Sequence, residues 1–169
     1  STMAIKLDRM DKQIVDLLAR DGRMSSKEIA RSIEGATERI VRYRIKRLIE
    51  ENVITVSAKV NPLVIGFPVI ADVFVEVEPS QVMSLARAMA QYECVTYVGC
   101  STGDRDISVQ IVARDNRELY EFVTEKIGQL PGVRRTSTSI VPIIIKDDHH
   151  WSIPETVIEK SQSAARKTT

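Results

Sequence analysis

The chain has 169 residues, and its 24 lysines and arginines nearly balance its 23 aspartates and glutamates, which leaves a formal charge of +1. This balance excludes a surface coated throughout for polyanion binding, while 43% apolar and 28% charged residues are typical of a chain that folds around a core in one or two domains. Two cysteines, two adjacent histidines and only short apolar runs give no sign of a disulfide framework, a metal site, a cofactor or a membrane span, so we expect a cytoplasmic protein without them.

Three short helices, each with its own start signal, are expected in residues 1–52. Asp8 is placed to cap the first helix. Ser25 and Glu28 have the spacing of a capping box, which opens a brief second helix. After a glycine turn, a third helix is predicted over residues 37–51. Two helices joined by such a turn are typical of a helix-turn-helix domain, here expected to be winged-helix-like.

Positive charge is concentrated in the third helix. Residues 1–60 carry 13 basic and 9 acidic side chains, whereas the rest of the chain carries 11 and 14. Residues 37–48 alone have a net charge of +4. Val41, Ile45 and Leu48 share one side of the helix, so most of the charged residues lie on the other side and face outward. We therefore expect an anionic partner at this helix.

The outward side of this helix is a candidate DNA surface. Arg39, Arg42 and Tyr43 are predicted to contact bases, because an arginine can donate two bonds to guanine, and Lys46 is predicted to contact a phosphate. Arg44 lies beside the apolar residues, so an ion pair with an acid of the first helix and a DNA contact both stay open. The second helix is predicted to hold a phosphate through the backbone N–H groups at its start. The predicted DNA-binding residues are Ser25, Ser26, Lys27, Thr37, Glu38, Arg39, Arg42, Tyr43 and Lys46.

The remaining chain reads as a connector, a second domain and a tail. Residues 53–65 are predicted to be a hinge strand and linker, because an alternating apolar pattern ends there at an Asn-Pro pair. Residues 66–148 follow with signals in the order β-α-β-β-α-β, typical of a ferredoxin-like domain. Its strands are expected at about residues 69–77, 95–101, 107–113 and 134–145.

The last strand and the tail carry two further signals. Pro142 cannot donate to a strand ladder, which places the last strand at a sheet edge. Residues 149–169 are predicted to be a C-terminal tail with one anchor, Trp151, and a mobile end from Ser161. The predicted fold class is therefore α+β, with a helix-turn-helix domain joined by a hinge strand to a ferredoxin-like domain.

Five short motifs, in a fixed order between residue 7 and about residue 146, resemble those of a known family. They are Leu7-Asp8-Arg9-Met10-Asp11, Asp21-Gly22-Arg23, Arg44-Ile45-Lys46-Arg47-Leu48 followed by Val53-Ile54, Gly103-Asp104-Arg105-Asp106, and Leu130-Pro131-Gly132-Val133. The chain resembles the Lrp/AsnC family of leucine-responsive, or feast/famine, transcription regulators. This resemblance implies a DNA-binding N-terminal domain, a hinge strand, and a C-terminal domain that oligomerises and senses amino acids or related metabolites.

The loop between the second and third strands is the candidate effector site. From the residues alone, it is an ordinary hairpin turn whose aspartates suit backbone hydrogen bonding. The resemblance implies that this loop lies near the ligand, at a contact between dimers. Two threonines of the last strand are added as hydroxyl partners for an amino acid, with the filling of a strand as the alternative. The predicted effector-binding residues are Gly103, Asp104, Arg105, Asp106, Thr136 and Thr138.

The basic helix and the resemblance together indicate a sequence-specific transcriptional regulator that responds to an amino acid or related metabolite. It is expected to bind double-stranded DNA as a dimer, tetramer or octamer. Two-fold pairing engages half-sites about 34 Å apart, which implies a palindromic operator.

Three alternatives are weighed against this regulator. One is a chromatin-like protein that organises DNA with low specificity. Another is a sirohaem-decarboxylase-like enzyme, which the lack of a histidine in either domain disfavours, so no enzymatic activity is expected. The third is RNA binding by the second domain, disfavoured because the strand at residues 107–113 has no stacking aromatic residue.

Overall fold

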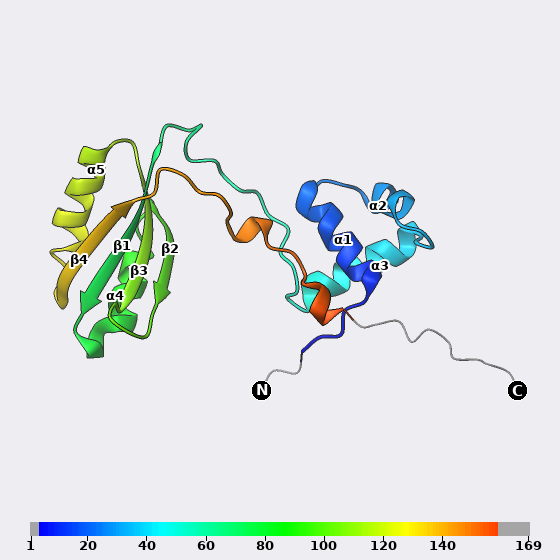
Figure 1. Cartoon of the computed structure of the whole chain (residues 1–169), viewed down its shortest axis with the longest axis horizontal. Coiled ribbons are helices and arrows are strands. Elements are labelled where there is room, and N and C mark those ends of the chain that lie inside the picture. Colours follow the sequence, from blue (N-terminus) through cyan, green and yellow to red (C-terminus); the bar gives the residue numbers. More distant parts are fainter. Residues whose placement is uncertain (1–3, 159–169) are drawn as a thin grey trace, which may run out of the picture. The chain divides into compact units, whose positions relative to one another are not determined.

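The computed structural model describes residues 4–158, which divide into two compact units. The first unit contains the helices α1 (Arg9–Arg20), α2 (Ser26–Ser32) and α3 (Glu38–Glu50) (Figure 1). It also contains residues 146–158, with two short turns, η3 (Asp148–His150) and η4 (Glu155–Val157). The second unit is Val60–Ile145. The end predicted to be mobile, from Ser161, lies outside the described residues.

The three helices of the first unit begin where the capping signals predict. The Asp8 carboxylate accepts the Asp11 N–H at 2.9 Å, and the Asp11 carboxylate accepts the Asp8 N–H at 3.0 Å. Ser25 and Glu28 form the same reciprocal pair at α2, and the Thr37 hydroxyl accepts a backbone N–H at the start of α3. These bonds satisfy donors that a helix start leaves open, and so they fix the starting points.

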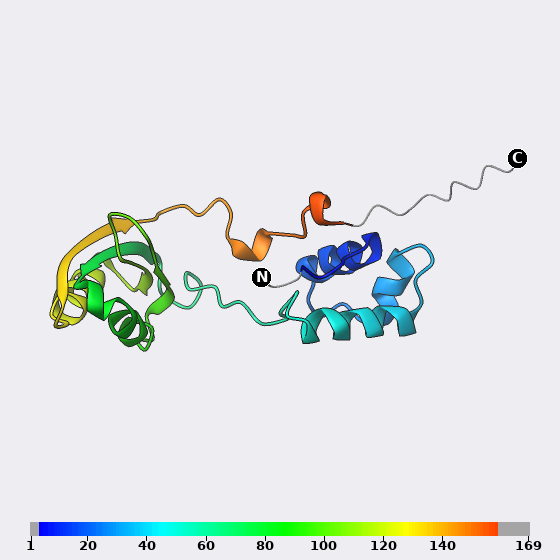
Figure 2. The same ribbon diagram turned by 90° about the horizontal axis from the view of Figure 1, so that it is seen from below.

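One apolar cluster holds the three helices together. Ile14 of α1, Ile29 of α2 and Val41 of α3 are fully buried in it. Gly35 makes the turn between α2 and α3 at a φ of +74°, a conformation that favours glycine. Figure 2 shows α3 along one side of this unit with α1 and α2 on its inner side, so the outer side of α3 faces solvent.

The second unit is the predicted β-α-β-β-α-β domain, which confirms the α+β fold class. Its strands pair antiparallel in the order β2-β3-β1-β4. In chain order, the elements are β1 (Val69–Val77), η1 (Pro79–Gln81), α4 (Val82–Met89), β2 (Val95–Cys100), β3 (Ile107–Ala113), α5 (Asn116–Glu121), η2 (Phe122–Ile127) and β4 (Val133–Ile140).

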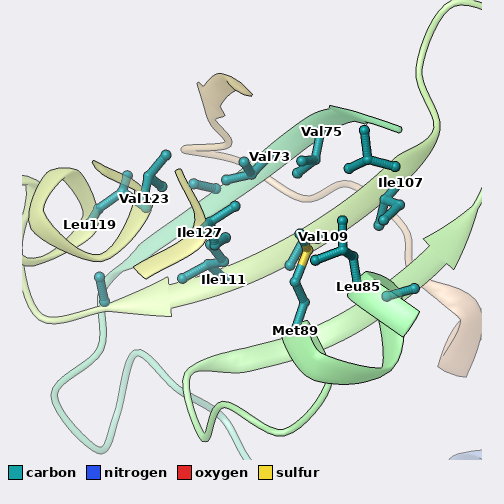
Figure 3. Packing of buried hydrophobic residues seen from close by; sticks show 14 residues of the cluster. Val73, Val75, Leu85, Met89, Ile107, Val109, Ile111, Leu119, Val123 and Ile127 are labelled. Carbon is teal, nitrogen blue, oxygen red and sulfur yellow. The ribbon is translucent and has the colours of Figure 1, made fainter. Parts of the chain in front are cut away.

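Both long helical segments of the second unit cover the same face of the sheet. Figure 3 shows Met89 of α4 and Leu119 of α5 packed with sheet residues such as Val73 and Ile111. Burial alternates along β1 and β3, so every second residue points into this core. The opposite face of the sheet is covered by no helix of the unit, and the cavity described below lies on it.

The connector between the domains differs from its prediction. Residues 53–65 form no strand, because no segment among residues 4–158 offers them a ladder partner. Residues 53–65 are thus in no strand of the described residues, and no hairpin wing follows α3 there. β4 is an edge strand, as predicted, but it ends at Ile140 because Pro142 has no N–H to donate.

The second helix of the sheet unit is interrupted by a π-helical turn. Residues 122–127, forming η2, continue α5, and the Gly128 N–H bonds to the Val123 oxygen at 2.8 Å. Leu119, Val123 and Ile127 recur every four residues, which overshoots a turn of α-helix by about 40° at each step. The wider π turn keeps these side chains on the sheet side.

The chain after residue 146 is not a free tail in the described residues, because it packs with the first unit. The predicted anchor, Trp151, is 70% exposed and anchors nothing. Ser152 and Glu155 make the contacts with α1 instead. Within residues 4–158, no helix combines the length and the apolar character needed to cross a membrane.

Candidate nucleic-acid interface and ligand cavity

The outward side of α3 carries most of the side chains predicted to contact DNA. They are exposed, Tyr43 by 67%, whereas Val41 and Leu48 on the inner side are fully buried. Their positions fall within one arc of the helix. The exposed set is Thr37, Glu38, Arg39, Arg42, Tyr43 and Lys46. Thr37 caps the helix, so its hydroxyl already serves the backbone.

Two cations of this surface are paired with acids of the same helix. Arg42 pairs with Glu38, and the Lys46 ammonium lies 3.7 Å from a Glu50 carboxylate oxygen. Exposed pairs of this spacing contribute only about 0.3–0.5 kcal/mol, so a phosphate or a base edge displaces them at little cost. Arg39 has no hydrogen bond or ion pair with any residue in the range 4–158, which leaves its guanidinium available.

The start of α2 differs from the expected phosphate site. The Glu28 carboxylate accepts the Ser25 N–H at 2.8 Å and the Ser25 hydroxyl at 2.7 Å. A carboxylate in this position takes the place of the expected phosphate and repels one, which corrects the expectation for Ser25. Lys27 stays exposed. Ser26 is half-buried and lines a shallow hollow with Arg42, Ile45, Lys46, Ile49 and Glu50.

A buried ion network joins α1 to α3. The Asp11 carboxylate is 1% exposed and accepts one bond from Arg44 at 2.9 Å and one from Arg47 at 2.8 Å. Arg44 also donates to both Asp8 oxygens at 2.7 Å. Of the two alternatives for Arg44, the structure therefore has the ion pair with the acids at the first helix. The network fixes the rotation of α3 and so determines which side chains face outward.

Neither Asp11 nor Arg47 is among the candidate site residues that the sequence predicts, although both lie within the family motifs. The available signal was an acid within the apolar stripe of α1, since Asp11 precedes Ile14 by three residues and Leu18 by seven. A carboxylate on a buried side requires a cation from a neighbouring element. The inner side of the basic α3 is the nearest source, although the Arg47 Nε itself is buried without a partner among the described residues.

The first prediction concerns the stability of the first unit at low pH. Burial raises the pKa of the Asp8 carboxyl, but the hydrogen bonds and charge of Arg44 act together with the backbone N–H groups of Asp11 and Met10 to hold the pKa below its ordinary value. Ionised Asp8 therefore stabilises the fold above its unfolded pKa, and this contribution is lost as the pH falls through the folded value. We expect the first unit to lose stability from about pH 5 to about pH 2 more steeply than in Asp8→Asn, which keeps a capping side chain. Urea unfolding at each pH measures this; equal slopes would contradict it.

The hairpin loop between β2 and β3 is tied to β1. Gly103 has a φ of +124°, which favours glycine. The Asp106 carboxylate accepts the Val77 N–H at 2.9 Å, at the point where the pairing of β1 with β4 is irregular. Asp106 therefore accepts a backbone hydrogen bond, as predicted for an aspartate in a turn. This bond holds the loop over the uncovered face of the sheet.

A cavity of about 180 Å³ opens beside this loop. It is lined by Asp104 and Arg105 of the loop, Phe74 and Glu76 of β1, and Arg135 and Ser137 of β4. The Arg105 guanidinium lies 4.1 Å above the centre of the Phe74 ring, a cation–π contact that orients it. Two guanidiniums and two carboxylates around one space suit a small molecule with both a negative and a positive group.

The two threonines predicted to complete this site lie elsewhere. In the register of β1 and β4, Thr136 is opposite Val75 and Thr138 is opposite Val73. Both valines are buried in the core, so the threonines belong to the helix-covered face and not to the cavity. The residues beside them, Arg135 and Ser137, occupy the cavity face. No group of three metal-binding side chains occurs within residues 4–158.

Comparison with known proteins supports this division of the chain. The sequence matches the AsnC-type helix-turn-helix domain over residues 7–49 and the Lrp/AsnC ligand binding domain over residues 70–150. An HTH-type transcriptional regulator of Pyrococcus furiosus is 38% identical over 141 residues, which are 83% of this chain and 95% of that protein. The chain belongs to the Lrp/AsnC family. Another member, the transcriptional regulator FL11 of Pyrococcus abyssi, is 35% identical over 140 residues, 82% of this chain and 91% of its own length.

Solved structures share the Lrp/AsnC fold. AsnC of Escherichia coli is 21% identical with a TM-score of 0.77, covering 85% of this chain and 99% of that one. A transcriptional regulator of Neisseria meningitidis, solved as a complex with L-Met, is 21% identical with a TM-score of 0.79, covering 88% and 97%. This Lrp/AsnC member is thus a transcriptional regulator with a DNA-binding helix-turn-helix unit and a ligand-binding sheet unit.

Proposed function

We propose that this regulator binds a specific palindromic operator through the outward side of α3, presented by two copies of the chain. The observation that carries this proposal is the exposed basic side of α3, set in place by the Asp11 network within an AsnC-type helix-turn-helix domain. Arg39 and Arg42 reach base edges, and Lys46 and Lys27 contact phosphates. Glu38 restrains Arg42 until DNA replaces it.

The second copy packs on the uncovered face of the sheet, so the cavity that opens on the same face borders the contact between the copies. That face carries half-buried Phe74 and Asp72 and a Tyr97 exposed by 58%, with no helix of the chain to cover them. Burial of such a face against its copy gives a two-fold interface, which presents two recognition helices to half-sites about 34 Å apart. Further association of dimers into a tetramer or octamer belongs to the same proposal.

The effector is a free amino acid bound in the cavity beside the hairpin loop. The guanidiniums of Arg105 and Arg135 suit its carboxylate, and the carboxylates of Asp104 and Glu76 suit its ammonium group. The L-Met bound to the Neisseria regulator of the same fold supports this class of ligand. Gly103 and Asp106 position the loop, and Thr136 and Thr138 take no part. The regulator would perform this work in the cytoplasm, where DNA and free amino acids meet.

Selection from a random DNA pool tests the proposed function. Duplexes retained by the protein should converge on a two-fold symmetric motif, and affinity for them should fall steeply as salt rises. Competition with random DNA separates a local regulator, which prefers the selected motif by about 10³-fold or more, from a chromatin-like DNA organiser. A flat response to salt, or retention without any motif, would refute the proposal.

RNA binding by the sheet unit is less well supported. β3 turns Ser108 and Gln110 toward the uncovered face, and neither offers a ring for base stacking. The relatives are transcriptional regulators, which likewise gives no support to an enzyme of the sirohaem-decarboxylase kind.

Removal of the cavity arginines should abolish the effector response. At a ligand concentration about 100 times its Kd, binding stabilises the folded chain by about 2.7 kcal/mol. A thermal shift screen of the twenty amino acids should therefore find at least one that raises the Tm. In Arg105→Ala/Arg135→Ala this rise should disappear, because no cation remains for the carboxylate.

The matched control for this prediction is Thr138→Ala, on the opposite face of the sheet. It should keep the full amino-acid response. A response kept by the arginine variant and lost in the threonine variant would move the effector site to the helix-covered face.

A further inference from the structure

The segment at residues 147–158, here called the clamp segment, lies along α1 of the first unit (Figure 2). Glu155 accepts two hydrogen bonds from the Arg9 guanidinium, at 2.8 and 2.7 Å. This paired geometry is the strong form of an arginine–carboxylate contact, and it lowers the pKa of the Glu155 carboxyl. The turn η4 is thus fastened to the start of α1.

Further contacts fasten the clamp segment along the same helix. The Ser152 hydroxyl donates to Asp16, and the Lys12 ammonium lies 3.0 Å from Asp16 and 3.5 Å from the Ser152 hydroxyl. Leu7 and Ile158 form a parallel bridge. Leu7 is only 8% exposed although it lies outside the apolar cluster of the three helices. The clamp segment therefore contacts α1 from just before its start to its middle.

Two lengths of chain run between the four-stranded sheet and the first unit, and they are joined to each other at both ends. In the first unit, Lys59 pairs with Asp147, where one length ends and the other begins. In the sheet unit, the Val141 N–H donates to the Ile70 oxygen at 2.7 Å. The two lengths are residues 60–68 and residues 141–146.

Most of the clamp contacts lie outside the parts of the chain that define the family. The matched domains end at residues 49 and 150. Ser152, Glu155 and Ile158 follow the second of these limits. The clamp segment thus lies mostly beyond the two matched family domains.

We propose that the clamp segment is a second tether, which joins the sheet unit to α1 in addition to the connector of residues 60–68. Without the clamp contacts, a single nine-residue connector joins the two units. With them, residues 141–146 close the chain into a loop. Six extended residues reach only about 20 Å, whereas nine reach about 30 Å, so a fastened clamp restricts the positions open to α3.

The second tether makes DNA binding sensitive to the spacing of the half-sites. This consequence rests on the proposed function, in which two copies present two recognition helices. A shorter tether raises the effective concentration of the second recognition helix at half-sites whose spacing the tether can span. It prevents binding of that helix at half-sites with other spacings. When the clamp contacts are broken, the affinity for DNA should depend less on the spacing of the half-sites.

The test uses the full chain with charges reversed at two clamp contacts. Each exposed pair is weak by itself, so Asp147→Lys and Glu155→Arg are combined and place like charges opposite Lys59 and Arg9. The swap variant adds Lys59→Asp and Arg9→Glu, which restores both pairs with reversed signs. The control variant, Glu121→Arg/Glu125→Lys, adds the same charge as the first variant at exposed positions of the sheet unit.

The tether itself is measured through Trp151, the single tryptophan of the chain, which lies exposed on the clamp segment. In the wild type, its fluorescence anisotropy should decay with the slow rotation of the folded unit. In Asp147→Lys/Glu155→Arg, a fast component should carry about half of the decay or more, as in mobile termini. The swap variant should return to the wild-type decay, and the control should not differ from it.

The result is unambiguous even if one variant fails to fold. Circular dichroism reports whether the helices persist, and the swap variant then decides alone, since it must recover both helices and slow decay. A fast component in the wild type as large as in a folded Asp147→Lys/Glu155→Arg would overturn the tether.

Half-site spacing provides the second measurement. Duplexes selected by the wild-type chain are altered by inserting half a helical turn between their half-sites. The wild type should lose about 10-fold or more in affinity, and the released variant less than about 3-fold. Equal losses in both would overturn the spacing role. Failure of the wild type to select any DNA would refute the proposed function. The decay of the Trp151 fluorescence anisotropy would still show whether the tether exists.

Discussion

Replacement of Arg39 and Arg42 by alanine should lower the affinity for a selected operator by about 100-fold or more, since each lost arginine–base contact costs about 1–3 kcal/mol. Both guanidiniums lie on the exposed side of α3, and neither contributes to the core of the unit. Affinity for random DNA should fall much less, because phosphate contacts from Lys46 and Lys27 remain. Fluorescence titration of the two DNAs at one salt concentration gives the ratio directly.

The matched control for this prediction removes two arginines from the sheet unit. Arg114 and Arg117 are exposed and pair with nearby acids of the same segment, Glu118 and Glu121. Arg114→Ala/Arg117→Ala removes the same charge and should leave the preference for the operator intact. Equal losses in both variants would show that overall charge, and not the outward side of α3, determines binding.

Asp11→Asn should destabilise the first unit by about 3 kcal/mol, because the loss of one partner from a buried ion pair costs about 3–5 kcal/mol. We expect the lower end of that range, since Arg44 and Arg47 remain partly exposed and can reach water. For a unit of this size, the loss lowers the Tm by at least about 10 °C. Scanning calorimetry should show the first unit unfolding before an unaltered sheet unit.

Two further variants serve as controls for this prediction. Asp21→Asn changes an acid of the same unit whose side chain is 47% exposed, and it should move the Tm little. Asp11→Leu/Arg44→Met/Arg47→Met replaces the buried carboxylate and both of its arginine partners with apolar side chains, and it should recover most of the stability. A Tm for Asp11→Asn within about 1 °C of the wild type would contradict a structural role for the network.

Local signals predicted the elements of this fold well. Asp8 and Ser25 each cap the helix that they were expected to cap, and their bonds involve residues three positions away. Alternating burial in β1 and β3 follows an alternation visible in the sequence. Features that depend on residues close together in the chain, such as helix caps and strand alternation, can therefore be predicted from the sequence.

Choices that depend on distant partners were harder. The last strand contains serines and threonines in turn, so hydroxyl chemistry alone did not tell which of them faces the core; the register with β1 decides it. The connector lacks its strand because no partner exists within the described chain. Contacts of the clamp segment with α1 join residues more than 130 positions apart, and no local pattern marks them.

The division of labour within α3 has a consequence for how such regulators diverge. Inward-facing Arg44 and Arg47 are committed to the carboxylate beneath them, whereas the residues that would touch an operator take no part in the core. Exchanges at outward positions can therefore retarget the protein to other genes without a loss of folding free energy. A family built on this helix is free to explore new binding motifs while its architecture stays constant.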